Sequence, residues 1–306
     1  MSIPAPILVT GAHRTGTTWV GKMLAASSQV AYISEPLNVW HRPGVLRAPV
    51  SKWYTLICQE NEDEFLPAFR DLLNFRYGLV REIRSLRSRK DFLRMGRDFS
   101  IFLSGRLLRQ RPLIKDPFAV FSAAWFATRL GCRVVITVRH PAGFASSLKR
   151  LNWSFDFRDL LEQPLLMERW LGVDRAEMEA AQTDDILGQA ALLWRMIYRV
   201  VARMMKLHPS IIVVRHEDLS HDPVSCYRDL YAALDLDFTP AVERTILNAS
   251  SSENPTELLR SNVHAVKLDS RANLDNWKKR LSPDEILRIR KITGKTAKLF
   301  YSDEEW

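Results

Sequence analysis

The chain has 306 residues, 46% of them hydrophobic and 26% charged, and its 44 lysines and arginines against 35 acidic residues give a formal net charge of +9. This composition excludes a disordered chain, and three widely spaced cysteines exclude a disulfide scaffold and a cysteine-based zinc site. Charge-free stretches are too short for a membrane span and no signal peptide is recognisable, so we expect a cytoplasmic protein of one domain, residues 1–306, with an anionic ligand.

Five short apolar runs predict strands, at residues 7–10, 30–33, 112–114, 133–138 and 211–214. They lack polar alternation, as strands of a parallel sheet do when helices cover both faces. Helical periodicity follows at residues 19–26, 118–130 and 142–151, and a long helix is predicted over 186–207. The alternation of strands and helices predicts an α/β fold of three layers around a central parallel sheet.

A helical insertion is predicted at about residues 40–111, between the second and third strands. Residues 76–111 hold eleven basic and three acidic residues, a surplus of +8, with apolar residues recurring between them. We expect helices with one cationic face and one apolar stripe, whose aromatic residues take mostly core-like positions. The cationic face is a candidate contact for an acidic acceptor, a peripheral lipid surface or another partner, and a solvated helix surface is the alternative.

The segment Gly11-Ala12-His13-Arg14-Thr15-Gly16-Thr17-Thr18-Trp19 follows the first strand and precedes a helix. A turn in this context aims backbone N–H groups and a helix N-terminus at one anion. The two glycines have the spacing of the nucleotide-triphosphate P-loop, but Thr17 stands where that loop has lysine, and Arg14 lies inside the loop instead. In the alternative interpretation, Thr17 or Thr18 merely caps the helix and Trp19 belongs to the core.

A second motif begins where the strand at residues 133–138 ends. Arg139 follows that strand directly, at the edge where α/β sheets bind ligands, and Ser147 comes eight residues later on a predicted helix. A helix start with a solvated arginine and serine is the alternative. Residues 215–219, after the last strand, are interpreted as structural support near the same edge.

Together the two motifs resemble those of sulfotransferases that use 3′-phosphoadenosine 5′-phosphosulfate (PAPS), and residues 7–280 carry the resemblance. It implies that the loop holds the 5′-phosphosulfate through Arg14, Thr15, Gly16, Thr17 and Thr18, with Trp19 as the aromatic residue that follows. It also implies that Arg139 and Ser147 hold the 3′-phosphate. Arg271 matches a lysine of the loop that closes over the nucleotide, although Ala272 replaces a glycine there. An arginine at position 14 is nearer the carbohydrate-directed group than the cytosolic small-molecule group.

The resemblance implies that the chain transfers a sulfuryl group from PAPS to a hydroxyl acceptor, for which a sugar or glycoconjugate is the candidate class. The 3′-phosphoadenosine 5′-phosphate product (PAP) is released, and no metal is needed. Arg14 and Lys115, which ends the third strand, match the cations near the sulfuryl group. Glu35 is the expected base, with Asp116 and His41 as alternatives, because Pro117 replaces the histidine of cytosolic members.

Two other functions remain open from the sequence. A P-loop nucleotide-dependent kinase shares the loop and the fold class, but the Gly-Lys-Ser/Thr lysine is missing. A non-enzymatic binder of anionic polymers would act through residues 76–111. The aromatic residues there do not form a stacking array for bases, so we expect no specific nucleic acid partner.

Overall fold

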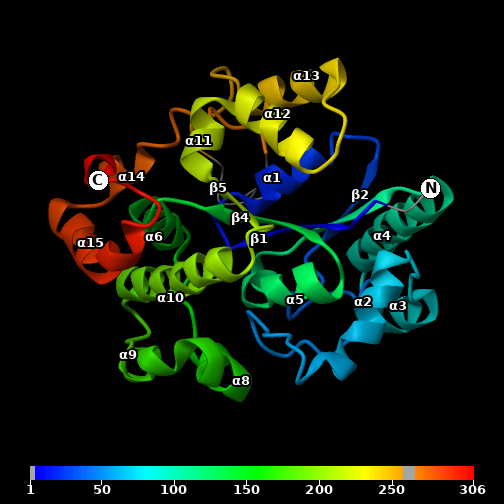
Figure 1. Cartoon of the computed structure of the whole chain (residues 1–306), viewed down its shortest axis with the longest axis horizontal. Coiled ribbons are helices and arrows are strands. Elements are labelled where there is room, and N and C mark those ends of the chain that lie inside the picture. The colour runs from blue at the N-terminus through cyan, green and yellow to red at the C-terminus, as the bar shows by residue number, and fades with distance from the viewer. Residues whose placement is uncertain (1–3, 258–265) are drawn as a thin grey trace.

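The computed structural model describes residues 4–257 and 266–306 and shows a parallel sheet between layers of helices (Figure 1). Its strands are β1 (Ile7–Gly11), β2 (Val30–Ser34), β3 (Arg111–Lys115), β4 (Arg133–Val138) and β5 (Ile212–Arg215), in the order β2-β3-β1-β4-β5. Every predicted strand is present with bounds that differ by at most one residue. The predicted three-layer α/β fold with a central parallel sheet is confirmed.

Alternate residues of the central strands face two separate cores. Ile7 and Val9 of β1 pack with α1 (Thr17–Leu24), α12 (Pro223–Ala233) and α13 (Pro240–Ser250). Leu8 faces the opposite core, which contains α5 (Ala123–Arg129), α6 (Pro141–Leu151), α10 (Ile186–Leu207) and α15 (Pro283–Ala297). Because both faces of the sheet are covered, β1 is buried along its whole length, which explains its continuous apolar run.

The predicted helix over residues 118–130 is split in two. A 3₁₀ segment spans Pro117–Ser122, and α5 continues from Ala123. The carboxylate of Asp116 accepts a hydrogen bond from the backbone N–H of Phe118 and so starts the 3₁₀ segment. The long helix α10, in contrast, has the predicted bounds of residues 186 and 207.

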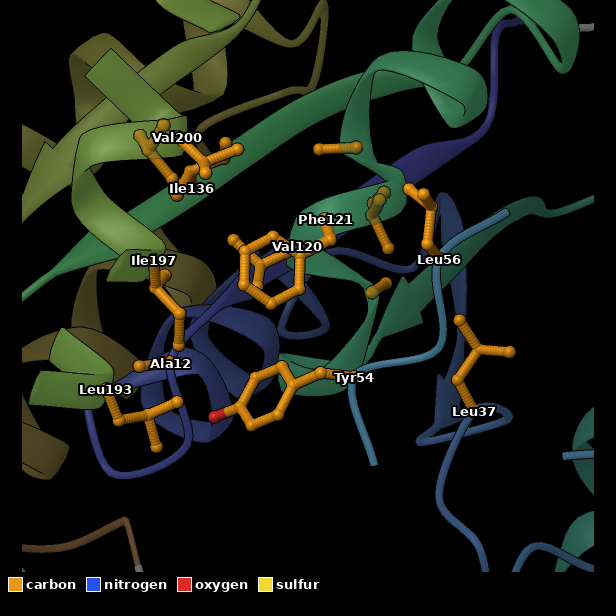
Figure 2. Close-up of a cluster of buried hydrophobic side chains, with 14 of the residues drawn as sticks. Ala12, Leu37, Tyr54, Leu56, Val120, Phe121, Ile136, Leu193, Ile197 and Val200 are labelled. Carbon is orange, nitrogen blue, oxygen red and sulfur yellow. The ribbon is translucent and has the colours of Figure 1, made fainter. Parts of the chain in front are cut away.

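The insertion between β2 and β3 contains α2 (Leu66–Leu73), α3 (Leu79–Ser85) and α4 (Arg89–Leu107). Its first part joins the main core, because the Tyr54 ring lies 6.0 Å from the Phe121 ring and both residues are buried. Figure 2 shows Tyr54 pointing from the insertion toward Ala12 and Leu193. The insertion is therefore anchored in the core that also contains Ala12, a residue of the loop after β1.

The apolar residues of α3 and α4 depart from the expectation. Phe102 is buried against Phe75 and Tyr77, but Phe92 is 61% exposed and Phe99 37% exposed. Seven aliphatic residues of the same segment are also exposed: Leu79, Val80, Ile83, Leu93, Leu103, Leu107 and Leu108. The expectation that the aromatic residues here take mostly core-like positions is wrong for Phe92 and Phe99.

Shorter helices complete the fold: α7 (Arg158–Leu161), α8 (Pro164–Leu166), α9 (Arg175–Glu179), α11 (His216–His221) and α14 (Asn276–Arg280). Within the described part of the chain, no helix has both the length and the hydropathy of a membrane span.

Candidate active site

The loop between β1 and α1 has the backbone of an anion-binding turn. Gly11 and Gly16 have positive φ angles of 144° and 96°, and Arg14 between them has a φ of 67°. A Cβ at Gly16 would lie 2.9 Å from Nδ1 of His216, so both the angle and the space favour glycine there. Gly16 is the N-cap of α1, and among the described residues no side-chain hydrogen bond caps this helix. The interpretation that Thr17 or Thr18 caps the helix is therefore wrong.

The side chains of this loop divide between the protein interior and a cleft, which we call the nucleotide cleft. The loop residues that line it are Arg14, Gly16, Thr17, Thr18 and Trp19. Thr15 is the exception, because its buried hydroxyl is bonded to the carbonyl of Ala12 at 2.6 Å and to Oγ1 of Thr137 at 2.8 Å. Thr15 thus holds the loop against β4 rather than facing the cleft.

Two aromatic side chains at the cleft have buried polar atoms without a hydrogen-bond partner among residues 4–257 and 266–306. They are Nε1 of Trp19 and both ring nitrogens of His216, and the two rings lie 5.8 Å apart. Burial lowers the pKa of His216 well below its usual value, so the imidazole is neutral. The sequence assigned residues 215–219 only a supporting role. Glu217 does have one, since its carboxylate accepts bonds from His140 N and Tyr301 Oη.

The two sequence motifs meet in this cleft. Nη1 of Arg139 donates to the carbonyl of Arg14 at 3.3 Å, and Nε of Arg14 lies 3.4 Å from Oγ of Ser147. Arg150 and Arg280 line the same cleft. Burial, followed by the charges of Arg139 and Arg150, lowers the pKa of Arg14 to about 10. Four arginines therefore stand close enough to repel one another.

Arg150 and Arg280 were not among the residues predicted from the sequence. Arg150 lies three residues after Ser147 on α6, and that helical spacing was the available signal. Arg280 ends α14 and has no such signal. The carboxylate of Glu257 lies 3.5 Å from Nε of Arg150 and also pairs with Arg280, so it bridges the two guanidinium groups.

Arg271 does not join this group in the structure. Its side chain is exposed, and its Nε and Nη2 donate to the carbonyl of His221 at 3.0 and 2.7 Å. Its neighbours Ser270 and Asn273 line the nucleotide cleft, but Arg271 does not. The predicted contact of Arg271 with the 3′-phosphate therefore stays a prediction that this conformation does not display.

Lys115 and Glu35 form an ion pair at the ends of β3 and β2. The Lys115 side chain is only 2% exposed, and its Nζ donates to Oε1 of Glu35. The backbone fixes the pair, since the N–H of Glu35 donates to the carbonyl of Lys115 at 2.7 Å. Glu35 has a left-handed φ of 51°, and Nδ2 of Asn38 donates to its second oxygen at 2.9 Å. The structure thus brings together two of the predicted catalytic residues.

Of the two alternative bases, Asp116 has surroundings that indicate a structural role. It is fully buried, it accepts backbone bonds from Leu37 at 2.5 Å and Phe118 at 2.9 Å, and burial raises its pKa to about 7. His41 is only partly buried and lines the same cleft as Glu35 and Lys115; its Nδ1 is 3.0 Å from the carbonyl of Asn38, and burial lowers its pKa. His41 is therefore the stronger alternative to Glu35.

The ion pair lies in a second cleft of about 580 Å³, which we call the acceptor cleft. Its lining contains the cations Lys22, Arg42, Arg94 and Arg97, and the exposed indole of Trp40. Thr18 lines both this cleft and the nucleotide cleft, and it is the one residue of the described chain that these two linings share. The two clefts therefore adjoin at Thr18.

Several solved structures are similar to this chain in fold. The sulfotransferase domain of the Synechococcus PCC 7002 olefin synthase is 17% identical, with a TM-score of 0.52 over 99% of this chain and 97% of that one. The sulfotransferase domain from the curacin biosynthetic pathway is 16% identical, with a TM-score of 0.50 over 99% of both chains. Mouse sulfotransferase SULT7A1, solved with PAP, is 13% identical with a TM-score of 0.43, over 98% of this chain and 86% of that one. None of the curated proteins compared matches the chain.

At these identities the first two structures show a common fold. The family itself is shown by sequence, because a profile described as the sulfotransferase family matches residues 6–240, most of the chain. This chain belongs to the sulfotransferase family.

Proposed function

We propose that this sulfotransferase uses PAPS as its donor and transfers the sulfuryl group to a hydroxyl acceptor. The observation that carries the proposal is the meeting of the two clefts at Thr18, with an anion-binding loop on one side and the Lys115–Glu35 pair on the other. A P-loop kinase would need the lysine that Thr17 replaces. Family membership and this geometry both favour sulfuryl transfer over the kinase.

The nucleotide cleft fits a nucleotide with two separate phosphates. Arg14 and the first backbone N–H groups of α1 would hold the 5′-phosphate. Arg139, Ser147 and Arg150 would hold the 3′-phosphate, which also relieves the repulsion among the arginines. Trp19 and His216 line the same cleft, and their rings would offer apolar surface to an adenine.

PAPS supplies the sulfuryl group, and its 5′-phosphate is the leaving group. The protein contributes position and charge, as in phosphoryl transfer. The Glu35 carboxylate accepts the proton of the acceptor hydroxyl. The Lys115 ammonium and the Arg14 guanidinium stabilise negative charge that develops on the transferred and leaving oxygens. Since Lys115 is buried, its charge is little screened by water.

The acceptor cleft supports a polar acceptor with negative charge. Lys22, Arg94 and Arg97 line it. Burial, followed by the positive charges of Arg97 and Lys115, lowers the pKa of Lys22. An anionic group on the acceptor would relieve this crowding. The Trp40 indole, 81% exposed, adds a flat apolar surface at the same cleft. We therefore propose acidic sugars and glycoconjugates as the first acceptors to test.

The direct test is an acceptor screen with PAPS in which the PAP released is measured. Sulfated product together with equimolar PAP supports the proposal. If the chain binds ATP but neither PAPS nor PAP, the proposal is wrong.

A second test asks which arginines hold the 3′-phosphate, by calorimetric titration of PAP into variants. Arg150→Ala is expected to weaken PAP binding by about tenfold or more, since a hydrogen bond to a charged group contributes about 1.5–3 kcal/mol. Arg271→Ala is the matched comparison, because Arg271 has the same chemistry but is bonded to His221 outside the cleft. If only Arg271→Ala weakens binding, the C-terminal loop must move when nucleotide binds, and our placement of the 3′-phosphate on Arg150 is wrong.

A further inference from the structure

The face formed by residues 79–109, which we call the α3–α4 surface, exposes large apolar side chains. Nine of them are at least 37% exposed: Leu79, Val80, Ile83, Phe92, Leu93, Phe99, Leu103, Leu107 and Leu108. Along α4, positions 92, 96, 99, 103 and 107 recur every three or four residues and so share one side of the helix. A Cβ at Gly96, in the middle of this row, would meet no atom within 4 Å, so the row is open. Monomeric soluble proteins rarely expose a contiguous patch of large apolar side chains unless that patch binds a partner.

The same surface is strongly cationic. Its exposed basic residues outside the acceptor cleft are Arg81, Arg84, Arg87, Arg89, Lys90, Arg106 and Arg109. None of its three acidic residues is exposed: Glu82 and Asp91 pair with Arg42, and Asp98 pairs with Arg97. The charge that the surface presents is therefore almost entirely positive, and a partner must match both apolar and cationic groups.

These two properties select among possible partners. A second copy of the chain would satisfy the apolar groups, but a two-fold contact would bring two cationic surfaces together. The phosphates of a nucleic acid would pair with the arginines, but a nucleic acid would leave the exposed leucine, valine and isoleucine side chains without apolar contacts. The interface of an anionic bilayer accepts both, because apolar side chains enter the acyl boundary while lysines and arginines meet the headgroups.

We propose that the α3–α4 surface docks the protein on an anionic lipid membrane. In Figure 1, α3 and α4 lie at one end of the molecule, well away from α6 and α15 at the other end. The opposite side of α4 lines the acceptor cleft through Arg94, Arg97 and Ile101. Docking through the exposed side of α4 would therefore hold the acceptor cleft one helix diameter, roughly 10 Å, from the membrane surface. A cytoplasmic location, as the sequence predicts, would expose this surface to an anionic leaflet.

The test measures co-sedimentation of the full chain with vesicles of phosphatidylcholine alone or of phosphatidylcholine mixed with phosphatidylglycerol. We expect binding to the mixed vesicles, weak binding to the neutral ones, and a decline as salt rises. The triple variant Leu93→Ser/Leu103→Ser/Leu107→Ser is expected to bind the mixed vesicles about tenfold less tightly or worse. The triple variant Arg84→Gln/Arg87→Gln/Lys90→Gln is expected to lose at least as much.

A matched control replaces exposed leucines elsewhere: Leu247→Ser/Leu287→Ser/Leu299→Ser, at sites that are 48%, 66% and 60% exposed. This variant is expected to bind as the wild type does. The proposal is overturned if the wild type does not bind the mixed vesicles, or if the control loses as much binding as the α4 variant. It is also overturned if the wild type dimerises without lipid and the α4 variant does not, because the surface would then belong to a second copy.

Discussion

Glu35→Gln removes the proposed proton acceptor while it keeps the shape of the side chain. In the structure, the Glu35 carboxylate pairs with Nζ of Lys115 and accepts a bond from Asn38. An amide cannot take the proton of an attacking hydroxyl, so kcat is expected to fall by about 10²–10⁴-fold. Neither Glu35 nor Lys115 lines the nucleotide cleft, so the affinity for PAP is expected to stay unchanged.

The same change has a consequence for stability. Removing one partner of a fully buried ion pair costs about 3–5 kcal/mol, because the other charge is left buried alone. The Glu35 side chain is 22% exposed, so water reaches the pair, and we expect a loss of about 1–3 kcal/mol in the free energy of unfolding. Adding Lys115→Met removes the second charge, so the double variant should regain stability while it stays inactive.

The assay follows PAP release at saturating acceptor, with urea unfolding and PAP titration on the same preparations. Glu304→Gln, an exposed carboxylate outside both cleft linings, is the control and should match the wild type. His41→Gln tests the alternative base in the same cleft. Near-normal turnover of Glu35→Gln, with a large loss in His41→Gln, would refute the assignment of Glu35.

Three further outcomes are expected. Arg139→Ala should weaken PAP binding by about tenfold or more, measured by calorimetry, whereas unchanged affinity would show that the nucleotide is held elsewhere. Gly16→Ala should lower both PAP affinity and the free energy of unfolding, the latter by about 1–3 kcal/mol, because its φ of 96° and the nearby His216 oppose a side chain. Because the pKa of Asp116 is raised from 3.8 to about 7, its proton is held more tightly in the folded state, so wild-type stability should fall as pH rises between these values. Asp116→Asn should lack that decline in urea unfolding across this range, and identical pH slopes in the two proteins would contradict the role of burial.

The sheet could be predicted from the sequence because its strands are buried on both faces. Each strand then consists of a short apolar run, and the amphipathic helices between the strands make the alternation of strands and helices recognisable in the sequence. The phosphate loop could also be predicted, since two glycines at fixed spacing reflect two positive φ angles. What local pattern could not show is that Thr15 faces inward to Thr137 on β4, because that contact joins residues 122 positions apart.

The C-terminal part of the nucleotide cleft could not be predicted in the same way. The sequence predicts that Arg271 contacts the 3′-phosphate, because it lies in a segment that resembles the closing loop of the family. In the structure its guanidinium donates hydrogen bonds to the His221 carbonyl instead. Arg280 reaches the cleft instead, from the end of a five-residue helix whose direction no sequence pattern encodes. The exposed row on α4 is a similar case. Periodicity showed that its apolar residues share a side, but not that this side faces away from the core.

The arginines of the nucleotide cleft concentrate positive charge at one place in the free protein. Burial, followed by the charges of Arg139 and Arg150, lowers the pKa of Arg14, and the Glu257 carboxylate adds negative charge to this group by bridging Arg150 and Arg280. A dianionic phosphate at the same place makes stronger charge-assisted bonds than one carboxylate, and it requires Glu257 to give way. PAP should therefore stabilise the fold by mass action, and it should do so more strongly in Glu257→Gln, where the carboxylate of Glu257 no longer competes. If Glu257→Gln instead binds PAP more weakly than the wild type, Glu257 helps to form the site, and the bridge is part of the bound state rather than its substitute.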